Sequence, residues 1–392
     1  MANVAFLVEW FPVGGVERVI MNLAQPLTDR GHKVFLFVHC LFEEQLSQVF
    51  PIEYFILPHE ARSSRNYEFV RDAIIKHKID AFISPGRFPK YLPKLREEGV
   101  CKLGFVLHGC PFYEIIQKVG SFTDPNNMTF SKQLKLRLID YPKLKLGYYH
   151  RKMTKRYRTI YDNVDAYGVL FEEYGRMVTN ELEVPYEESK CFVLHNPLPE
   201  VEWKGEDSQR EKRVLFVGRL SYWDKRVDRL LAAWELIHKD FPEWKLSIVG
   251  AGTDKDHNSL EKIVRGQKLE RVEFLGFVPS PEKLYASSEI LCLSSSIEGC
   301  PMVLLEAQAH GCATMAFDCS AGVREILSPN WENGVYVPNG DIKAYAEALA
   351  KLMSDDELRH KIQTKCVDSA KRFSIENSIS QYDALIRKLC KE

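Results

Sequence analysis

The chain has 392 residues, of which 45% are hydrophobic and 27% are charged, and its formal net charge is −1. This composition is that of an ordinary folded protein, and it excludes a disordered, collagen-like or disulfide-stapled chain. The nearly balanced charge gives no global reason to bind nucleic acid. The length exceeds that of one typical domain and predicts two.

The ten cysteines form no CxxC pair and no Cys/His cluster with zinc spacing, so we expect reduced thiols in a cytoplasmic protein. The apolar run 4–8 stops at Glu9, which is too short for a secretion signal. The sequence contains no stretch of 18 apolar residues that would span a membrane.

Short apolar runs alternate with amphipathic stretches along the N-terminal half. Residues 16–31 and 65–78 have helical spacing of their apolar residues, and a Gly14-Gly15 loop precedes the first of these helices. The expected strands are residues 3–10, 33–38, 52–57, 80–85, 102–109, 165–171 and 191–197.

The second half repeats this alternation, with two helices beyond residue 341. Its expected strands are residues 213–218, 245–250, 272–277, 289–295, 313–318 and 334–338. Apolar runs of this length are typical of parallel strands that helices cover on both faces. The pattern therefore predicts an α/β protein with two Rossmann-like, doubly wound domains that face a cleft, and a ligand at the carboxyl ends of the strands.

The polar stretch after Pro197 marks the domain boundary. We expect an N-terminal domain over residues 1–196, a linker over 197–212 and a C-terminal domain over 213–373. The remaining residues, 374–392, are expected to form a helix that returns to the N-terminal domain.

Two cations follow the first strand of the second half. Arg219 comes directly after Gly218, and Lys225 precedes a helix that begins near Val227. A strand end with two cations and a helix N-terminus is suited to a diphosphate, although a solvated basic loop has the same composition.

Two glutamates follow the strand 289–295. Glu298 lies in the loop, and Glu306 lies one to two turns into the helix that Pro301 introduces. A carboxylate at this position accepts the paired hydroxyls of a ribose, or is simply a surface or helix-dipole acid.

The two cations and the two glutamates follow one another along the chain in a fixed order with three further segments. These segments are Gly250-Ala251-Gly252, the run 272–278 and the segment 334–341. This order resembles the retaining glycosyltransferases of the GT-B fold, family 4. The resemblance is strong over residues 213–354 and extends to 14–18, whereas residues 40–165 match weakly. The weak region is where such enzymes vary with the acceptor.

The resemblance implies a role for each matching residue. Arg219 and Lys225 would bind the donor diphosphate, Glu306 the ribose and Glu298 the donor sugar. The other donor-binding positions are Gly14 and Gly15 near the phosphates or acceptor, His108 near the sugar, Val278 near the base, and the backbone of Gly299, Cys300, Pro301 and Met302 near the sugar and phosphates. His108, Glu298, Arg219 and Lys225 are the predicted catalytic residues.

The sequence departs from the usual family pattern at three places. The spacing from Arg219 to Lys225 is one residue longer than the commonest form, Cys300 stands where an aromatic residue is common, and Tyr222-Trp223 is an unusual insertion. These departures affect the detailed geometry of the site.

The expected activity is transfer, with retention, of a hexose-type sugar from a nucleoside diphosphate, with UDP expected, to a saccharide or lipid-linked saccharide acceptor. The setting would be assembly of a surface polysaccharide or glycolipid. We expect no cofactor and no metal, because two cations and a helix N-terminus would stabilise the leaving diphosphate. The alternatives are a GT-B nucleotide-sugar epimerase or hydrolase and a non-catalytic nucleotide-sugar-binding protein.

Two further patterns require interpretation. Asp254 and Asp256 form a DxD triplet of the kind that binds metals elsewhere, which we interpret as a solvated loop. Residues 132–158 carry ten Lys or Arg, one Asp and several aromatic residues. This segment is either a solvated helix face or a peripheral contact with the inner membrane surface, and no nucleic-acid motif accompanies it.

Overall fold

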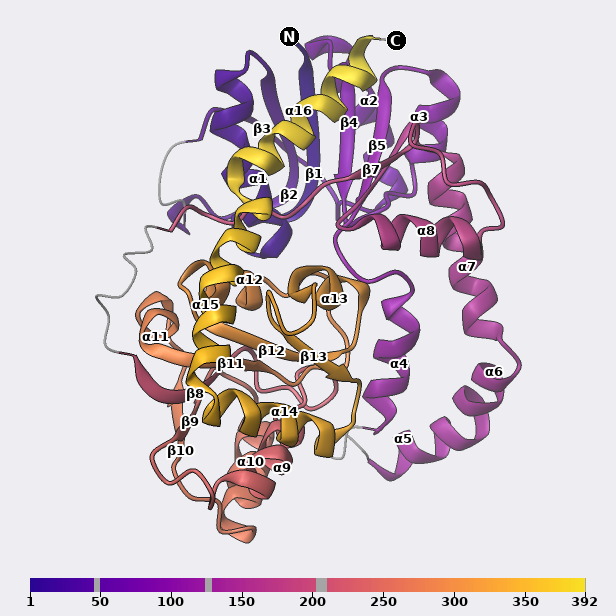
Figure 1. Ribbon diagram of the computed structural model, residues 1–392. Helices are drawn as coiled ribbons and strands as arrows, with labels where there is room; N and C mark the ends of the chain where they lie inside the picture. The colour runs from indigo at the N-terminus through magenta and orange to yellow at the C-terminus, as the bar shows by residue number, and fades with distance from the viewer. Residues whose placement is uncertain (46–49, 124–128, 202–209, 392) are drawn as a thin grey trace. The chain divides into compact units, whose positions relative to one another are not determined.

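The computed structural model describes residues 1–45, 50–123, 129–201 and 210–391 (Figure 1). Within these residues the strands form a seven-stranded and a six-stranded sheet, and every strand pair is parallel. The predicted α/β class with two doubly wound parallel sheets is confirmed.

The first sheet has the strand order β3-β2-β1-β4-β5-β6-β7. The last strand ends before the segment His195-Asn196-Pro197, and so is shorter than expected. The strands of this sheet are β1 (Asn3–Phe11), β2 (Lys33–Leu41), β3 (Ile52–Ile56), β4 (Ala81–Pro85), β5 (Lys102–Leu107), β6 (Ala166–Val169) and β7 (Cys191–Val193). The helices among these strands and at the C-terminus are α1 (Gly15–Asp29), α2 (Tyr67–His77), α3 (Leu92–Glu98), α8 (Glu172–Glu181) and α16 (Ile375–Lys391).

The second sheet has the order β10-β9-β8-β11-β12-β13, so β8 and β11 are its central pair. Its strands are β8 (Glu211–Val217), β9 (Lys245–Val249), β10 (Val272–Gly276), β11 (Ser288–Leu293), β12 (Ala313–Asp318) and β13 (Val335–Pro338). Its helices are α9 (Val227–Ile237), α10 (Asp254–Gly266), α11 (Glu282–Ser287), α12 (Met302–Ala309), α13 (Ala321–Leu327), α14 (Ile342–Ser354) and α15 (Asp356–Ala370).

The described chain divides into two compact units. The first comprises 1–111, 151–197 and 373–392, and the second comprises 112–150 and 198–372. Residues 112–150 lie within the range expected for the N-terminal domain, yet they cluster with the second unit. Half of the expected linker, residues 202–209, lies outside the described residues.

The described part of the segment 112–150 is mostly helical. It contains α4 (Tyr113–Thr123), α5 (Phe130–Lys135), a π-helical stretch η3 (Leu136–Asp140), α6 (Tyr141–Lys145) and the start of α7 (Tyr148–Asp162). None of the helices in the described part of the chain combines the length and the apolar composition needed to cross a lipid bilayer.

Each unit has its own apolar core. Trp234 and Trp244 are fully buried in the core of the second unit, among residues of β8, β9, β11 and β12. In the first unit, Tyr382 and Ile386 of α16 pack into the core that β1 and β2 form. Helix α16, drawn in yellow, runs beside α1 (Figure 1). His32 Nε2 lies 2.7 Å from Oδ1 of Asp383 in this helix, so a hydrogen bond reinforces the packing.

Candidate functional site

The loop after β8 is held against the loop after β9. The Gly218 amide donates to Val249, and the Leu220 amide donates to Ala251. Gly250 has a φ of +146°, and a Cβ on this residue would lie 1.8 Å from the Gly218 carbonyl oxygen. Only glycine permits this close approach of the two backbones, which explains the Gly-Ala-Gly sequence seen after β9.

Arg219 is held by a neighbouring carboxylate. Its guanidinium donates to Asp224 over 3.1 Å, while 70% of the Arg219 side chain remains exposed. Asp224 is buried and also accepts from the Lys225 amide over 2.9 Å. Burial raises the pKa of Asp224, although the charges of Arg219 and Lys225 act in the opposite direction.

Lys225 and Glu298 form a largely buried ion pair. The distance from Lys225 Nζ to Glu298 Oε1 is 2.7 Å, and the two side chains are 18% and 10% exposed. The Ser295 hydroxyl donates to the same carboxylate oxygen over 2.6 Å. The second cation of the β8–α9 loop therefore meets the first glutamate of the β11–α12 loop.

The loop between β8 and α9 carries Arg219 and Lys225, and we call it the cation loop. Serines that follow β11 fix its backbone. The Ser294 hydroxyl donates to the Lys225 carbonyl over 2.9 Å. The Ser296 hydroxyl donates to the Trp223 carbonyl over 2.9 Å, and the Ser296 amide donates to the Asp224 carbonyl over 2.7 Å. These bonds hold the loop that contains the Tyr222-Trp223 insertion, and the site is ordered around it.

Glu306 lies on α12, in the fifth position of the helix. Tyr285 donates its phenolic hydroxyl to Glu306 Oε2 over 2.8 Å. The tyrosine is buried, and burial together with this carboxylate raises its pKa, so the hydroxyl stays protonated and remains a donor. One oxygen of Glu306 is thereby fixed, which orients the carboxylate.

The remaining predicted positions of the second unit surround the start of α12. Pro301 is the residue that precedes the helix, so Gly299 and Cys300 form its approach and Met302 its first residue. Burial raises the pKa of the Cys300 thiol to about 12, so it remains protonated at neutral pH. Val278 follows β10 and is half-buried. These backbone positions and the two glutamates lie at the carboxyl end of the second sheet.

His108 follows β5 in the first unit. Its Nδ1 lies 3.2 Å from Asn196 Oδ1, which requires the proton on Nδ1. Burial lowers the pKa of His108 to about 4, so the ring is neutral at physiological pH. Its Nε2 is buried and has no hydrogen-bond partner among the residues that the structure describes. The ring therefore presents a lone pair that can accept a proton or a hydrogen bond.

Gly14 and Gly15 begin helix α1. Gly14 has a φ of +135°, and a Cβ on it would lie 2.1 Å from the carboxylate of Glu17. Glu17 is itself buried, and burial raises its pKa. The two glycines thus allow a backbone loop with amides at a helix N-terminus, which is a favourable place for an anion.

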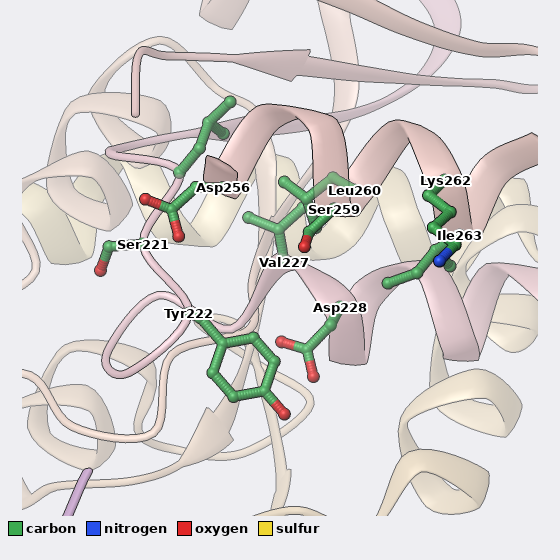
Figure 2. Close-up of a pocket in the computed structure, with 10 residues that line it drawn as sticks. Ser221, Tyr222, Val227, Asp228, Asp256, Ser259, Leu260, Lys262 and Ile263 are labelled. Carbon is green, nitrogen blue, oxygen red and sulfur yellow. The ribbon is translucent and has the colours of Figure 1, made fainter. Parts of the chain in front are cut away.

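A pocket of about 370 Å³ lies on the α9 and α10 side of the cation loop. Figure 2 shows Val227 and Asp228 of α9 facing Ser259 and Ile263 of α10. Asp228 pairs with Arg226 over 2.8 Å, so this carboxylate is already neutralised. The lining carries two carboxylates and one lysine, which makes it a poor site for a diphosphate.

The DxD triplet begins α10 rather than forming a loop. Asp256 accepts from the Thr253 hydroxyl over 2.6 Å, and Thr253 in turn caps the Asp256 amide, so the two residues form a capping box. The described residues contain no group of three His, Cys, Asp or Glu side chains that could hold a metal ion.

The structure brings Arg219, Lys225 and Glu298 together through Asp224 and Ser295, neither of which stood out in the sequence. Asp224 is adjacent to Lys225, and an acid beside a predicted phosphate-binding lysine was a usable signal. Tyr285 lies 21 residues from its partner Glu306, and Asn196 lies 88 residues from its partner His108. At these separations the sequence gives no recognisable signal that the two residues of each pair meet.

Comparison with known proteins finds a matching family model for each half of the chain. A family model described as Glycosyltransferase Family 4 matches residues 13–198, and one described as Glycosyl transferases group 1 matches residues 211–355. A solved structure of Anabaena Alr3699/HepE in complex with UDP superposes with a TM-score of 0.71 at 18% identity, over 99% of this chain and 100% of that one.

Two curated relatives illustrate the sequence matches. The amylovoran biosynthesis glycosyltransferase AmsD of Erwinia amylovora is 36% identical over 152 residues, which are 39% of this chain and 41% of that protein. A Campylobacter jejuni α-1,4-N-acetyl-D-galactosaminyltransferase, named for a diNAcBac-PP-undecaprenol glycan, is 28% identical over 181 residues, 46% of this chain and 49% of that protein. The chain thus spans about half the length, or less, of the curated relatives it matches. From the two family matches and the two-sheet fold, the chain belongs to the GT-B glycosyltransferases of family 4, group 1.

Proposed function

We propose that the chain transfers a hexose-type sugar from a nucleoside diphosphate, UDP in the first instance, to a saccharide or lipid-linked saccharide, with retention of the anomeric configuration. The observation that carries this proposal is the cluster of Arg219, Lys225 and Glu298 beside the first turns of α9 and α12. Two cations and two helix N-termini in one place favour a diphosphate.

The cluster suits the departure of a diphosphate. As the bond between the anomeric carbon and the diphosphate oxygen breaks, its electron pair moves to that oxygen. Lys225 has three ammonium protons and uses one for Glu298, so others remain to donate to phosphate oxygens. Arg219 is mostly exposed and can turn its fork toward the same anion. Stabilising charge where it develops is the largest catalytic effect available to such a site.

The acceptor hydroxyl would attack the anomeric carbon from the face that the diphosphate leaves, and its proton would pass to a diphosphate oxygen. This route needs no protein nucleophile. The ion pair supports it, because Glu298 already balances the Lys225 charge and would be a weak nucleophile. We further propose that the lone pair of His108 Nε2 accepts a hydrogen bond from a hydroxyl of the donor sugar.

The remaining contacts are proposed on the same basis. Glu306, oriented by Tyr285, would accept from the ribose hydroxyls, and the backbone at Val278 would contact the base. The amides of Gly14 and Gly15 would bind a phosphate or the acceptor. The backbone amides of Gly299, Cys300 and Met302 would donate to the sugar and phosphates. Pro301 has no amide N–H to donate, so it would contribute only the direction in which the helix starts.

The acceptor class is proposed from the relatives. AmsD is named for the biosynthesis of amylovoran, and the Campylobacter enzyme is named for an undecaprenol-linked glycan. We therefore propose that this chain acts in the assembly of a surface polysaccharide or glycolipid, from the cytoplasmic side. We also propose that transfer needs no metal, because the two cations can supply the positive charge.

The test is a binding screen of UDP-, GDP- and dTDP-sugars, followed by turnover with free and lipid-linked saccharides and determination of the product anomer. We expect transfer of sugar from one donor to an acceptor, with retention. Release of free sugar or conversion of the donor without any acceptor would show a hydrolase or epimerase instead. Binding without turnover for every acceptor class would support a binding protein. Loss of activity on chelation and its return with Mn²⁺ would contradict metal independence.

A further inference from the structure

The pocket between α9 and α10 has no part in the proposed transfer. Its volume is about 370 Å³, and none of the described residues that line it is a predicted donor-binding residue. The wall is largely apolar, since Leu220, Val227 and Leu260 are buried there and Ile263 is half-buried. Because a cavity of about 150 Å³ holds benzene, this pocket can hold a molecule of two or three fused rings.

Ser221 supplies the pocket with a polar group that lacks a partner. Its hydroxyl oxygen is buried and makes no hydrogen bond among the residues that the structure describes. The Ser221 carbonyl, by contrast, accepts from the amides of Lys225 and Arg226 over 3.1 and 3.2 Å, so the backbone beside the hydroxyl is fixed. A buried hydroxyl without a partner costs free energy that a bound polar group would recover. The pocket is therefore suited to a ligand with one hydroxyl or a similar group.

Tyr222, in the unusual insertion of the cation loop, forms another part of the wall. Figure 2 shows its ring beside Asp228, with Ser259 of α10 above it. The Arg226 guanidinium lies over the Tyr222 ring, 4.6 Å from the ring centroid, and this contact helps to hold the ring in place. The insertion thus gives the pocket an aromatic side chain, which favours a ligand that is itself aromatic.

The charges of the lining disfavour an anionic ligand. Asp228 and Asp256 both line the pocket, and Lys262 is the one cation among the described lining residues. Two carboxylates with a single lysine repel a further negative charge. A cationic ligand is not required either, because Asp228 already pairs with Arg226 over 2.8 Å and Asp256 accepts from the Thr253 hydroxyl. The lining therefore favours an uncharged ligand over a nucleotide or a fatty acid.

We propose that this pocket binds an uncharged aromatic molecule of two or three rings that carries one hydroxyl or comparable polar group. The apolar wall covers the rings, and the polar group forms a hydrogen bond with Ser221 Oγ. The ligand contacts Ser221 and Tyr222, which lie between Arg219 and Lys225 in the sequence. The site is therefore next to the donor-binding cations and shares no residue with them, so the ligand does not replace the donor.

The test is equilibrium dialysis of the full chain against 2-naphthol, naphthalene and 2-naphthoate, without donor or acceptor, so its result does not depend on the proposed transferase activity. We expect 2-naphthol to bind with a Kd of about 1 mM or lower, and the anion 2-naphthoate to bind about tenfold more weakly or worse. Ser221→Ala should weaken 2-naphthol binding about fivefold, since one hydrogen bond is lost, and should leave naphthalene binding unchanged. It should not lower the thermal unfolding midpoint, because Ser221 Oγ loses no partner within the described residues.

A variant that fills the pocket locates the bound molecule. Ser259→Phe places a ring among the lining residues and should abolish 2-naphthol binding. Asn258→Phe places the same ring at the neighbouring, exposed position of α10, outside the lining, and should bind 2-naphthol like the unaltered chain.

The proposal is overturned if 2-naphthol does not bind, if 2-naphthoate binds equally well, or if Ser259→Phe binds 2-naphthol as tightly as Asn258→Phe does. It is also overturned if Ser221→Ala weakens naphthalene binding as much as 2-naphthol binding. Should the Ser259→Phe chain not fold, the comparison of these two compounds on Ser221→Ala decides.

Discussion

Lys225 and Glu298 are 73 residues apart in the chain, yet Nζ of the lysine lies 2.7 Å from Oε1 of the glutamate. This ion pair joins the loop after β8 to the loop before α12, the two places where the sequence predicted donor contacts. Both side chains are largely buried, so the pair is weakly screened by solvent. A donor diphosphate would enter a site where the lysine is already positioned.

Lys225 should contribute mainly to the chemical step. We predict that Lys225→Ala lowers kcat by about 100- to 1,000-fold, because one donor to a developing oxyanion typically contributes that much. Lys225→Arg should keep part of the activity, since the charge remains. Steady-state kinetics with saturating donor measure both, with exposed Lys239→Ala as the control. A Lys225→Ala enzyme with a kcat close to that of the parent would remove Lys225 from the mechanism.

Asp224 should act through Arg219 rather than on the donor. Its carboxylate accepts from the Arg219 guanidinium and the Lys225 amide, and Asp224→Asn keeps the shape while weakening the first contact. We predict a fall of about tenfold in kcat/KM for the single variant, the size of a hydrogen bond to a charged group. In an Arg219→Ala background the same substitution should have almost no effect. Equal losses in the two backgrounds would contradict coupling between Asp224 and Arg219.

Glu306 should contribute to donor binding more than to the chemical step. We predict that Glu306→Gln weakens donor binding by about 10- to 100-fold, since a charged hydrogen bond to the ribose is lost. Tyr285→Phe removes only the hydroxyl that orients the carboxylate, so its effect should be smaller. Titration calorimetry with the donor nucleotide measures both variants. A larger loss of donor affinity in Tyr285→Phe than in Glu306→Gln would contradict this order.

His108 should remain neutral well below its usual pKa of 6.5, because burial lowers its pKa to about 4. Between these two values the unfolded chain takes up a proton that the folded chain does not. The His108 contribution therefore reduces the free energy of unfolding as the pH falls from 6.5 towards about 4. Proton NMR of the His108 ring, assigned with His108→Gln, should show titration near pH 4. A midpoint near 6.5 would contradict the buried, neutral ring.

Much of the fold could be predicted because apolar runs of 4–6 residues mark parallel strands strongly. The strands 213–218 and 289–295 were expected close to where β8 and β11 lie, and this placed both donor loops at one sheet edge. The DxD triplet was expected as a loop, yet Asp254 begins α10. Thr253 and Asp256 have the spacing of a capping box, and this local signal indicated the helix start.

The partners of the site residues were harder to predict. The Lys225–Glu298 ion pair and the bond from Tyr285 to Glu306 depend on how two loops and two helices meet, which spacing along the chain does not specify. The exposure of Leu138 and Leu146 was equally invisible, since leucines at helical spacing ordinarily face a core. In the structure Leu138 and Leu146 are 67% and 71% exposed, whereas Asp140 on the same helical stretch is buried.

We propose that Arg219 and Lys225 hold the diphosphate of the donor. Titration of UDP, GDP and dTDP into the unaltered chain and into the Arg219→Ala/Lys225→Ala variant tests it directly, because no acceptor or turnover is needed. We predict that one nucleotide binds the unaltered chain and that the double substitution weakens its binding by about a hundredfold or more. Equal affinity of that nucleotide for both proteins would contradict the claim.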